Sequence, residues 1–531
     1  MNDGSRYVEQ ALLPGLPDLP RPAAGDGEGA SPDDAPGTAS PAGTDAAPRD
    51  DQHLLPGFTL VALLDMDGTT PAARAADTAD DTQTADADPV GARMHVFAPE
   101  RPEPGPPPIT VIGLGLDDAL RPEALRILRQ AETLALPRRL LKRFQRSKAR
   151  LIPLSPPLEP ALQALEEHRR QGRRCVVLAD GDPLLYGIGA SLARRLGTAG
   201  ETPDKALRIL PGLSALQTAC ARLALPWHDL RAVSLHGRTD WIPLAHAVLG
   251  GHPVGVYTDE ARTPAHIARF LLERGVDWYR MAVAADLETP RECLRQVELH
   301  EAAGLTWAGG ETVVLVPAGP ARGPRLGLDE SALVADAGLF TKAPVRAAAL
   351  SLLGLTPDAT LWDIGAGSGA VALEAAALVP RGRVFAVERQ PDRVLCIQEN
   401  RRRLGAPHLD IVQDSAPAGL DALPDPDAIF VGGGLSSGPA IHACETSCPA
   451  PEADAAPLLN ILLERLKAGG TLVAACSLLS SLRTLTGYLE SRGLPCELTQ
   501  IQAAVSSPLA GSLTLKAHNP IMLVRTRKAR E

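Results

Sequence analysis

A run of glycines between a strand and a helix is the feature that most limits how this chain can fold. The segment DIGAGSG at 363–369 follows a short apolar run, and an apolar helix is predicted from Val371 to Leu378. Glycines at such a turn let the backbone bend sharply and let a ligand approach it closely. The pattern predicts an α/β unit with a mainly parallel sheet, whose ligands lie beside the carboxyl ends of the strands.

An acidic residue closes the strand that follows this loop. The run RVFAVE at 383–388 reads as a strand and ends on Glu388, whose carboxylate can accept hydrogen bonds from both hydroxyls of a ribose. These features fit NAD as well as S-adenosylmethionine. The spacing, however, is G-x-G-x-G instead of G-x-G-x-x-G, and Asp363 just ahead of the loop would repel a pyrophosphate. S-adenosylmethionine has no phosphate and carries an ammonium and a sulfonium, so we favour it over NAD and over a purely structural turn.

The ends of the next strands extend this predicted cofactor site. Asp414 follows the third strand, where such domains commonly contact an adenine ring; its alternative interpretation is an ordinary cap at a strand end. The triple glycine at 432–434 closes the fourth strand, where amino-group methyltransferases of DNA bases usually carry an Asn/Asp-Pro-Pro-Tyr motif. This disfavours a nucleic-acid substrate and leaves room for a bulky, flat one. The predicted cofactor-binding residues are Asp363, Gly365, Gly367, Gly369, Glu388, Asp414, Ser415 and Ala416.

A second series of strands and loops lies upstream of this unit. Its apolar runs alternate with helical patterns, one of which extends from Arg121 to Leu136, and this alternation implies another mainly parallel sheet. The runs that read as strands are 109–112, 175–179, 207–210, 253–257 and 281–285. Each following loop alone fits turn chemistry, but three in this order are expected to surround one cleft. The residues predicted to bind cofactor there are Gly113, Gly115, Asp180, Gly181, Asp182, Tyr186, Gly187 and Ser214.

The negative charge of the chain is concentrated at its N-terminus. Residues 1–104 hold 19 Asp+Glu and 6 Lys+Arg, a net charge of -13, whereas the remainder holds 44 and 47, a net charge of +3. A segment so rich in Ala, Pro, Gly and Asp cannot bury enough apolar surface to fold. The two α/β units do not resemble each other, so two different folds are expected. The expected organisation is a disordered acidic leader at 1–107, one α/β domain at 108–318, a linker at 319–332 and a Rossmann-like domain at 333–531.

One segment of the leader carries a recognisable pattern. The residues DMDGTT at 65–70 follow an apolar run and resemble the first motif of haloacid-dehalogenase-type phosphatases. That chemistry also needs a lysine and a distal acidic pair on a surrounding domain, and the low-complexity residues that follow supply none. We favour a short sticky segment in a linker over a phosphatase site.

Charge and cysteine usage narrow the possible partners and the compartment. A nearly neutral body gives no electrostatic case for nucleic-acid binding. The eight cysteines are scattered singly, as in reduced cytosolic proteins, and Cys444 and Cys448 have no second pair at metal-site spacing, so no metal is predicted. The N-terminus lacks the features of a signal peptide, and no apolar run approaches the roughly 20 residues of a membrane helix. We expect a cytoplasmic protein that binds no membrane.

Both halves resemble known families of methyltransferases. Residues 108–316 resemble the tetrapyrrole methylases, in particular the type that methylates carbon 5 of a cobalamin precursor, through ITVIGLG, VVLADGDPLLYGIG, ILPGLSALQTACARLALPW and VSLHGR. Residues 333–531 resemble the enzymes that methylate carbon 15 and decarboxylate an acetate side chain, through TKAPVRAAALSLL, LWDIGAGSGAVALEAA, VERQPDR, SAPAGL, DAIFVGGG and AHNPIMLV. The fused order is similar to that of the precorrin-6Y C(5,15)-methyltransferases (decarboxylating).

This resemblance implies a fold, a cofactor and a reaction. The expected fold is a class III tetrapyrrole methylase α/β domain followed by a class I Rossmann-like methyltransferase domain. The expected reaction converts precorrin-6Y to precorrin-8X in cobalamin biosynthesis with S-adenosylmethionine as the methyl donor. The meso carbons of reduced tetrapyrroles are already nucleophilic, so positioning matters more than a strong base. Lys342 and Arg346 are predicted to seat substrate carboxylates, with Arg238 and Lys516 as further candidates; the alternative for each is a solvated surface charge.

Two other functions remain open at this point. A methyltransferase fusion that acts on RNA or on a small natural product would be supported by a basic face or an inserted nucleic-acid module, and the sequence has neither. A non-catalytic scaffold with decayed sites is disfavoured because Asp363, Gly365, Gly367 and Glu388 are intact. We expect a homo-oligomer whose small-molecule partner is a precorrin.

Overall fold

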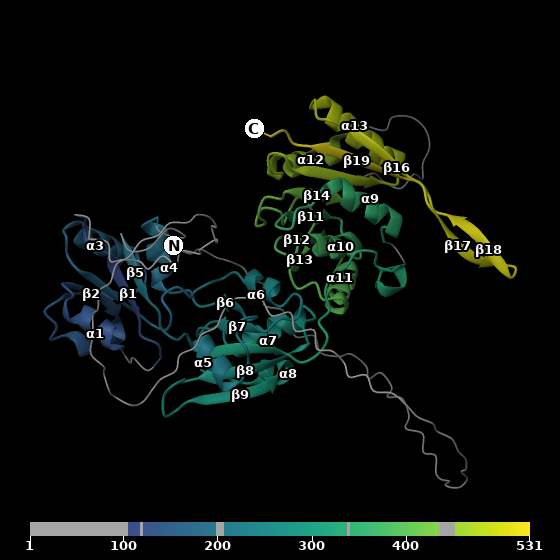
Figure 1. Ribbon diagram of the computed structural model, residues 1–531. Coiled ribbons are helices and arrows are strands. Elements are labelled where there is room, and N and C mark those ends of the chain that lie inside the picture. Colours follow the sequence, from purple (N-terminus) through teal and green to yellow (C-terminus); the bar gives the residue numbers. More distant parts are fainter. Residues whose placement is uncertain are drawn as a thin grey trace, which may run out of the picture. The chain divides into compact units, whose positions relative to one another are not determined.

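The computed structural model describes residues 105–530, apart from 117–119, 198–205, 337–339, 434 and 436–451 (Figure 1). The DMDGTT segment, Cys444 and Cys448 lie outside the described residues, as does all of the predicted leader except 105–107. Within the described part, every helix is too short or too polar to span a membrane.

The chain from residue 108 begins with a fully parallel sheet of five strands in the order β3-β2-β4-β1-β5. These strands are β1 (Ile109–Gly113), β2 (Thr133–Pro137), β3 (Arg150–Leu154), β4 (Cys175–Ala179) and β5 (Leu207–Leu210). The helices between them are α1 (Pro122–Arg129), α2 (Leu141–Phe144), α3 (Glu159–Arg170) and α4 (Ile188–Arg195). The single helix expected from Arg121 to Leu136 is wrong, because Thr133–Pro137 is a buried strand. Pro137 disfavours a helical conformation at the residue before it.

A mixed sheet completes the first domain. Its order is β6-β7-β10-β8-β9, with β6 parallel to β7 and the other pairs antiparallel. Its strands are β6 (Arg231–Ser234), β7 (Val254–Tyr257), β8 (Tyr279–Ala285), β9 (Cys293–Glu298) and β10 (Thr312–Pro317). The helices in this part are α5 (Ala215–Arg222), α6 (Ile242–Ala247), α7 (Pro264–Glu273) and α8 (Leu299–Gly304).

The second domain contains one sheet of seven strands in the order β13-β12-β11-β14-β15-β19-β16. The strands are β11 (Thr360–Ile364), β12 (Arg383–Glu388), β13 (Leu409–Gln413), β14 (Ala428–Val431), β15 (Thr471–Cys476), β16 (Glu497–Ile501) and β19 (Ile521–Arg527). The helices are α9 (Ala343–Leu353), α10 (Ala370–Leu378), α11 (Pro391–Leu404), α12 (Glu452–Arg465) and α13 (Leu479–Ser491). The order changes direction between β11 and β14, which opens a crevice at their carboxyl ends.

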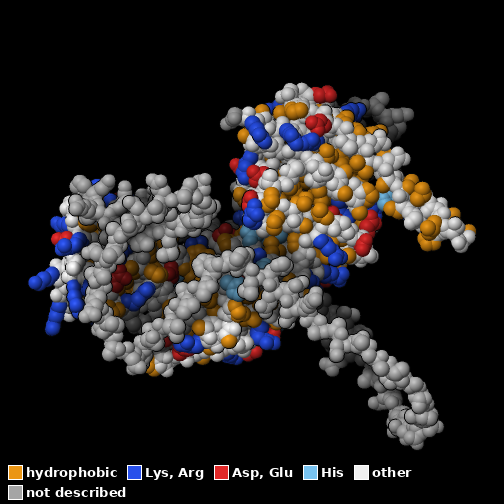
Figure 2. Space-filling view, in the orientation of Figure 1, with side chains coloured by type: hydrophobic (Ala, Val, Ile, Leu, Met, Phe, Trp, Pro, Cys, Tyr) orange, Lys and Arg blue, Asp and Glu red, His pale blue; other side chains and the backbone are white. Residues whose placement is uncertain are grey.

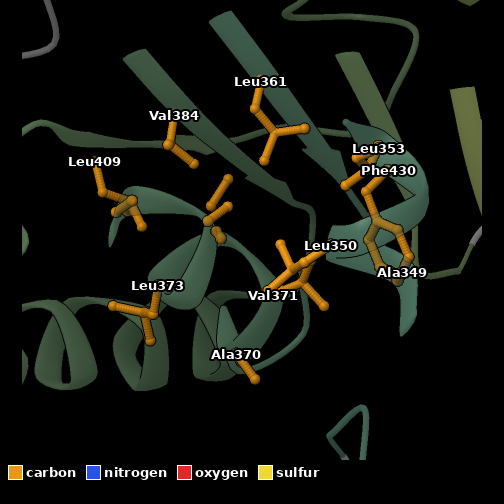
Figure 3. Close-up of a cluster of buried hydrophobic side chains, with 14 of the residues drawn as sticks. Ala349, Leu350, Leu353, Leu361, Ala370, Val371, Leu373, Val384, Leu409 and Phe430 are labelled. Carbon is orange, nitrogen blue, oxygen red and sulfur yellow. The ribbon is translucent and has the colours of Figure 1, made fainter. Parts of the chain in front are cut away.

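Hydrophobic side chains fill both faces of this seven-stranded sheet. Because side chains alternate along a strand, Leu361 faces a core with α9 and α10, and Trp362 faces another with α12 and α13. Figure 3 shows the first core, where Leu350, Val371 and Phe430 lie together. Helix α10 is almost wholly apolar and buried, which fixes the glycine loop that precedes it. The three sheets confirm the predicted α/β class and two different folds.

A hairpin extends away from the second domain between β16 and β19 (Figure 1). It consists of β17 (Ala504–Leu509) and β18 (Ser512–Ala517), paired only with each other among the described strands. Figure 2 shows hydrophobic side chains gathered on it. Leu509, Leu513 and Leu515 are 61%, 71% and 72% exposed. This much exposed apolar surface is unusual for an isolated hairpin.

Candidate functional site

A cavity of about 790 Å³ lies at the carboxyl ends of the central strands of the second domain. It is bordered by the loops that follow β11, β12, β13, β14 and β15, by the start of α9, by α12 and by the base of the hairpin. The described residues that line it include Phe340, Thr341, Lys342, Gly365, Ala366, Gly367, Ser368, Glu388, Arg389, Arg393, Asp414, Ser415, Ala416, Gly432, Gly433, Pro457, Leu458, Ser477, Ile501, Ala503, His518 and Asn519.

The glycine loop forms one wall of this cavity in a conformation that favours glycine. Gly365, Gly367 and Gly369 have φ of 69°, 60° and 76°, in the left-handed region. A Cβ atom at Gly365 would lie 3.1 Å from Gly433, and one at Gly369 would lie 2.9 Å from Ile397. Gly365 and Gly367 line the cavity, whereas Gly369 caps helix α10.

Asp363 lies beneath the loop and does not line the cavity. Its side chain is 1% exposed, and its Oδ2 accepts a hydrogen bond of 3.0 Å from the backbone N–H of Ala372 in the first turn of α10. Burial, with a smaller contribution from the charge of Glu388, raises the pKa of this carboxyl to about 7 against the opposing effect of the bond from Ala372. The carboxyl therefore occupies the N-terminus of α10, where a phosphate would otherwise bind.

Glu388 is the acidic group that faces the cavity. Its Oε2 accepts a hydrogen bond of 2.9 Å from the N–H of Gly367, and its Oε1 accepts one of 3.0 Å from the N–H of Gln390. The side chain is 4% exposed and lines the cavity. Each carboxylate oxygen has a second lone pair, so both remain able to accept a hydrogen bond from a ligand hydroxyl. Asp414, Ser415 and Ala416 line the same cavity after β13, as the sequence placed them.

Asn400 holds the glycine loop from behind, and sequence reasoning missed it. This fully buried side chain on α11 donates hydrogen bonds to the carbonyl of Ser368 at 2.9 Å and to that of Val334 at 2.8 Å. Its Oδ1 accepts a bond of 2.7 Å from the N–H of Val334. The available signal was a polar residue among the apolar positions of α11 that face the core.

The predicted substrate cations fall in different places. Lys342 lines the cavity, with its Nζ 3.0 Å from Glu330 and 4.0 Å from the centre of the Phe340 ring. Arg346 is fully buried and pairs with Glu374, and it also bonds the carbonyls of Thr341 and Leu328. The interpretation of Arg346 as a seat for substrate therefore finds no support, because the guanidinium is enclosed in the core.

Other cations border the cavity in the predicted motif VERQPDR, where the sequence had pointed to none. Arg393 pairs with Asp336 at 3.3 Å, and Arg389 makes no hydrogen bond or ion pair with a described residue. Lys516 lies on the exposed hairpin strand β18 and does not line the cavity.

The predicted loops of the first domain meet at the carboxyl ends of β4, β1 and β5. Gly115 and Gly181 form an isolated bridge, with the N–H of Gly181 donating to the carbonyl of Gly115 at 3.1 Å. A Cβ atom at Gly113 would lie 2.5 Å from the backbone of Gly212. The three loops therefore touch through their backbones, and glycine is required for that approach.

The side chains of these loops mostly stabilise the loops themselves. Asp182 accepts hydrogen bonds from the N–H groups of Leu184 and Leu185, and Ser214 caps helix α5. Asp180 pairs with Arg139. Gly187 precedes α4 and packs against the carbonyl of Pro183.

Tyr186 differs from the other predicted residues of the first domain. It is 44% exposed, adopts a φ of 57° that is strained for a bulky side chain, and donates from its hydroxyl to the carbonyl of Ala232 at 2.7 Å. Arg238 lies over its ring at 5.2 Å from the centre. An exposed aromatic ring held in this way, with a cation over it, suits a flat anionic ligand.

Two family models match the chain, one in each domain. The model of tetrapyrrole (corrin/porphyrin) methylases matches residues 108–303, and the model of the precorrin methyltransferase domain matches residues 332–452.

Curated relatives resemble both the whole chain and parts of it. A precorrin-6Y C(5,15)-methyltransferase [decarboxylating] of Sinorhizobium is 32% identical to this chain, over a stretch that covers 78% of this chain and 95% of the relative's length. A cobalt-precorrin-6B C(15)-methyltransferase (decarboxylating) of Salmonella typhimurium is 32% identical over 36% of this chain and 89% of its own. A cobalt-precorrin-7 C(5)-methyltransferase of the same organism is 32% identical over 35% of this chain and 87% of its own. Separate enzymes thus match portions of a chain that a single relative matches over 78% of its length.

Proposed function

Because this chain belongs to the family of precorrin-6Y C(5,15)-methyltransferases (decarboxylating), we propose that its two domains divide the family's reaction between two sites. The chain methylates precorrin-6Y at carbons 5 and 15, with decarboxylation, in cobalamin biosynthesis. The first domain adds the methyl group at carbon 5, and the second adds the one at carbon 15 and decarboxylates. The observation that carries this assignment is the 790 Å³ cavity of the second domain, whose walls combine an adenosine-type site with substrate-side cations.

S-adenosylmethionine is the methyl donor that fits this cavity. The donor supplies an electrophilic methyl on a sulfonium. Glu388 is placed to accept hydrogen bonds from ribose hydroxyls, and the Gly365–Gly367 turn leaves the backbone open to the ligand. The helix N-terminus behind the loop is already capped by Asp363, so a dinucleotide's pyrophosphate finds no free site there. We assign the same donor to the first domain, at the junction of the loops after β1, β4 and β5.

The precorrin substrate is held on the other side of the cavity. Lys342 meets its peripheral carboxylates there, and Arg393 and Arg389, which line the cavity after β12, meet those that extend toward the donor side. Lys342 and Arg393 already pair with the partly exposed acids Glu330 and Asp336, so each can exchange one carboxylate for another at little cost. Gly432 and Gly433 leave the floor free of side chains for a flat macrocycle. The residues here hold the ring carbon in line with the donor methyl, which is the main contribution that positioning makes.

A homo-oligomer is the assembly that best accounts for the hairpin. Directly opposite residues of an antiparallel pair share a face, so Pro508, Leu513 and Leu515 lie together with Ala504 and Ala517. The opposite face carries Lys516, Val505, Leu509 and three hydroxyl side chains. Both outer edges of this two-stranded sheet lack a partner strand among the described residues, and such hairpins are marginal alone in water. We propose that the apolar face packs against the hairpin of another copy, as in a symmetric assembly.

The compartment that we propose is the cytoplasm. The described cysteines, Cys175, Cys220, Cys293, Cys396, Cys476 and Cys496, are all free thiols. A chain with this many unpaired cysteines is typical of a reducing compartment.

The decisive experiment supplies the intact chain with precorrin-6Y and methyl-labelled S-adenosylmethionine. We expect two labelled methyl groups and loss of one carboxyl group, located at carbons 5 and 15 and at the acetate by mass spectrometry and carbon NMR. A product with a single labelled methyl, or the absence of donor binding in calorimetry, would refute the assignment of one active site to each domain.

A further inference from the structure

In the cavity of the second domain, the half that lies opposite the glycine loop contains few groups able to exchange a proton. The lining residues that follow β11, β12 and β13 form the half that we assign to the donor. The start of α9, the end of β15 and the segments next to β16 and β19 form the other half. Its described polar lining residues are Thr341, Lys342, Ser477, His518 and Asn519. Only Lys342 and His518 among them carry a side chain that gains and loses protons.

The other titratable residues that line the cavity already make interactions of their own or keep a fixed charge. Both oxygens of Glu388 accept backbone hydrogen bonds on the donor side. Lys342 is held by Glu330 and by the Phe340 ring, as suits a fixed positive charge. Arg389 and Arg393 keep their protons throughout the physiological range. Asp414 accepts a backbone hydrogen bond from Ser415 on the donor side. On the substrate side, the titratable lining residues are therefore Lys342, which is paired with a carboxylate, and His518.

His518 is held in a way that leaves one ring nitrogen for a ligand. It lies between β18 and β19, and its backbone N–H donates to the carbonyl of Ala503 at 2.9 Å, which fixes the segment at the base of the hairpin. Its Nδ1 is enclosed and has no hydrogen-bond partner among the described residues. The side chain as a whole is half-buried, and no described residue hydrogen-bonds its Nε2. Because the side chain lines the cavity, Nε2 is the atom that can reach a bound substrate.

We propose that His518 delivers the proton that completes the decarboxylation, an inference that rests on the function proposed for the second domain. When the bond between the acetate methylene and its carboxylate breaks, carbon dioxide leaves and the electron pair stays on the methylene carbon, conjugated with the ring. The protonated imidazole transfers its Nε2 proton to that carbon as the bond breaks, so the carbon becomes a methyl group in the same step and the bond does not break without the proton. The neutral imidazole then regains a proton from solvent. The step consumes one proton, and it needs no oxidant, no reductant and no second methyl donor.

The test separates the two reactions of one site by their products. In the intact chain with precorrin-6Y and methyl-labelled S-adenosylmethionine, His518→Gln should slow decarboxylation by about a hundredfold or more, the usual contribution of a positioned acid. Methylation at carbon 15 and donor affinity in calorimetry should stay close to wild type, so a methylated product that retains its acetate accumulates. Free imidazole should restore decarboxylation to His518→Ala, because the cavity is large enough to admit it. Rescue of this kind would not follow from a structural role.

The matched control is His300→Gln, an exposed histidine on α8 of the first domain, which should change neither product. Decarboxylation at the wild-type rate in His518→Gln would overturn the proposal. So would joint loss of donor binding and both reactions, because His518 would then shape the cavity instead of supplying a proton. Failure of the wild-type chain to label carbon 15 would refute the proposed function itself, which is a separate outcome.

Discussion

Asp363 acts from beneath the glycine loop, through the helix that follows. A carboxyl that is 1% exposed and has one hydrogen-bonded oxygen is costly to ionise, which is why its pKa is raised to about 7. Its Oδ1 has no partner among the described residues. Asp363 therefore contributes its packing and its hydrogen bond with Ala372. Glu388 presents the negative charge that a ligand meets.

This placement predicts a pH-dependent stability with a definite sign. The folded pKa of Asp363 lies above its ordinary value of 3.8, so the folded state binds the proton more tightly than the unfolded state. That stabilisation is fully present below pH 4 and is lost as the pH rises to about 7; the total is roughly 4 kcal/mol. Compared with wild type, Asp363→Asn should gain about 2–3 kcal/mol between pH 5 and pH 8. Hydrogen exchange of peptides from β11 and α10 measures this, and parallel pH profiles of the two proteins would contradict it.

Asn400 offers a second test of how the loop is held. Asn400→Ala leaves the N–H and carbonyl of Val334 and the carbonyl of Ser368 without this partner. Unsatisfied buried groups cost about 1–3 kcal/mol each, so we expect a destabilisation of about 2–4 kcal/mol and a donor affinity about tenfold lower. Gln398→Ala, exposed on the same helix, is the matched control and should change neither quantity. Thermal unfolding and calorimetry report the two effects; unchanged donor affinity in a less stable protein would mean that the loop is positioned by other contacts.

The residues that the sequence revealed are those whose roles depend on local spacing. Gly365, Gly367 and Glu388 follow strand ends at short intervals, so their neighbourhood could be predicted. Asn400 reaches residues up to 66 positions away, and His518 joins the cavity through a strand added at the far side of the sheet. Arg346 looked like a substrate cation because it lies near a family motif, but tertiary packing buries it against Glu374.

At the scale of elements, strongly patterned segments were predictable and interrupted ones were not. Helix α11 (Pro391–Leu404) has bounds that its sequence marks, since a proline opens it and Gly405 closes it with a φ of 66°. The false helix to Leu136 arose because a four-residue apolar run fits a helix and a buried strand equally well. The hairpin had no predicted counterpart. Ser512–Ala517 alternates polar and apolar residues, but its partner Ala504–Leu509 does not, and a single short alternating run does not establish a hairpin.

The hairpin predicts a separable effect on assembly. Leu513→Ser with Leu515→Ser removes two large, exposed side chains from its apolar face and should leave each chain folded. If this face packs on another copy, losing both leucines costs about 3 kcal/mol or more, and the dissociation constant rises at least about a hundredfold. Leu509→Ser, on the opposite face, is the matched control. Light scattering across a dilution series measures the mass; equal dissociation of all three proteins would remove the hairpin from the interface.

At the scale of the whole molecule, the two domains are joined by more than the linker. The described residues from Gly105 to Arg530 belong to one unit. Arg274 of α7 pairs with Asp410 of β13 at 2.7 Å, with both side chains less than 20% exposed. Burial and the charge of Arg274 lower the pKa of nearby Arg401 to about 10. Separate expression of the two domains would remove this ion pair, so the division of labour is best tested by substitution in the intact chain.

Glu388→Ala is the substitution that tests this division. Losing a charged hydrogen bond costs roughly 1.5–3 kcal/mol, or about ten- to a hundredfold in donor affinity at the second site. The first domain has its own loops, so methylation at carbon 5 should continue at the wild-type rate and serves as an internal control. The product should carry the carbon-5 methyl, lack the carbon-15 methyl and retain its acetate, as mass spectrometry can show.

The effect of Glu388→Ala is compared with that of Glu388→Gln, and its effect on methylation with its effect on decarboxylation. Glu388 also accepts the N–H of Gly367, so Glu388→Gln, which keeps one acceptor and the side-chain shape, separates loss of the loop anchor from loss of charge. We expect the alanine variant to bind the donor more weakly than the glutamine variant, because only alanine frees the loop. Decarboxylation should fall together with carbon-15 methylation, since an empty donor site leaves the substrate poorly positioned even though loss of carbon dioxide consumes no methyl group. A variant that decarboxylates at the normal rate without methylating would break that coupling and place the decarboxylation wholly on the side of the cavity that contains His518.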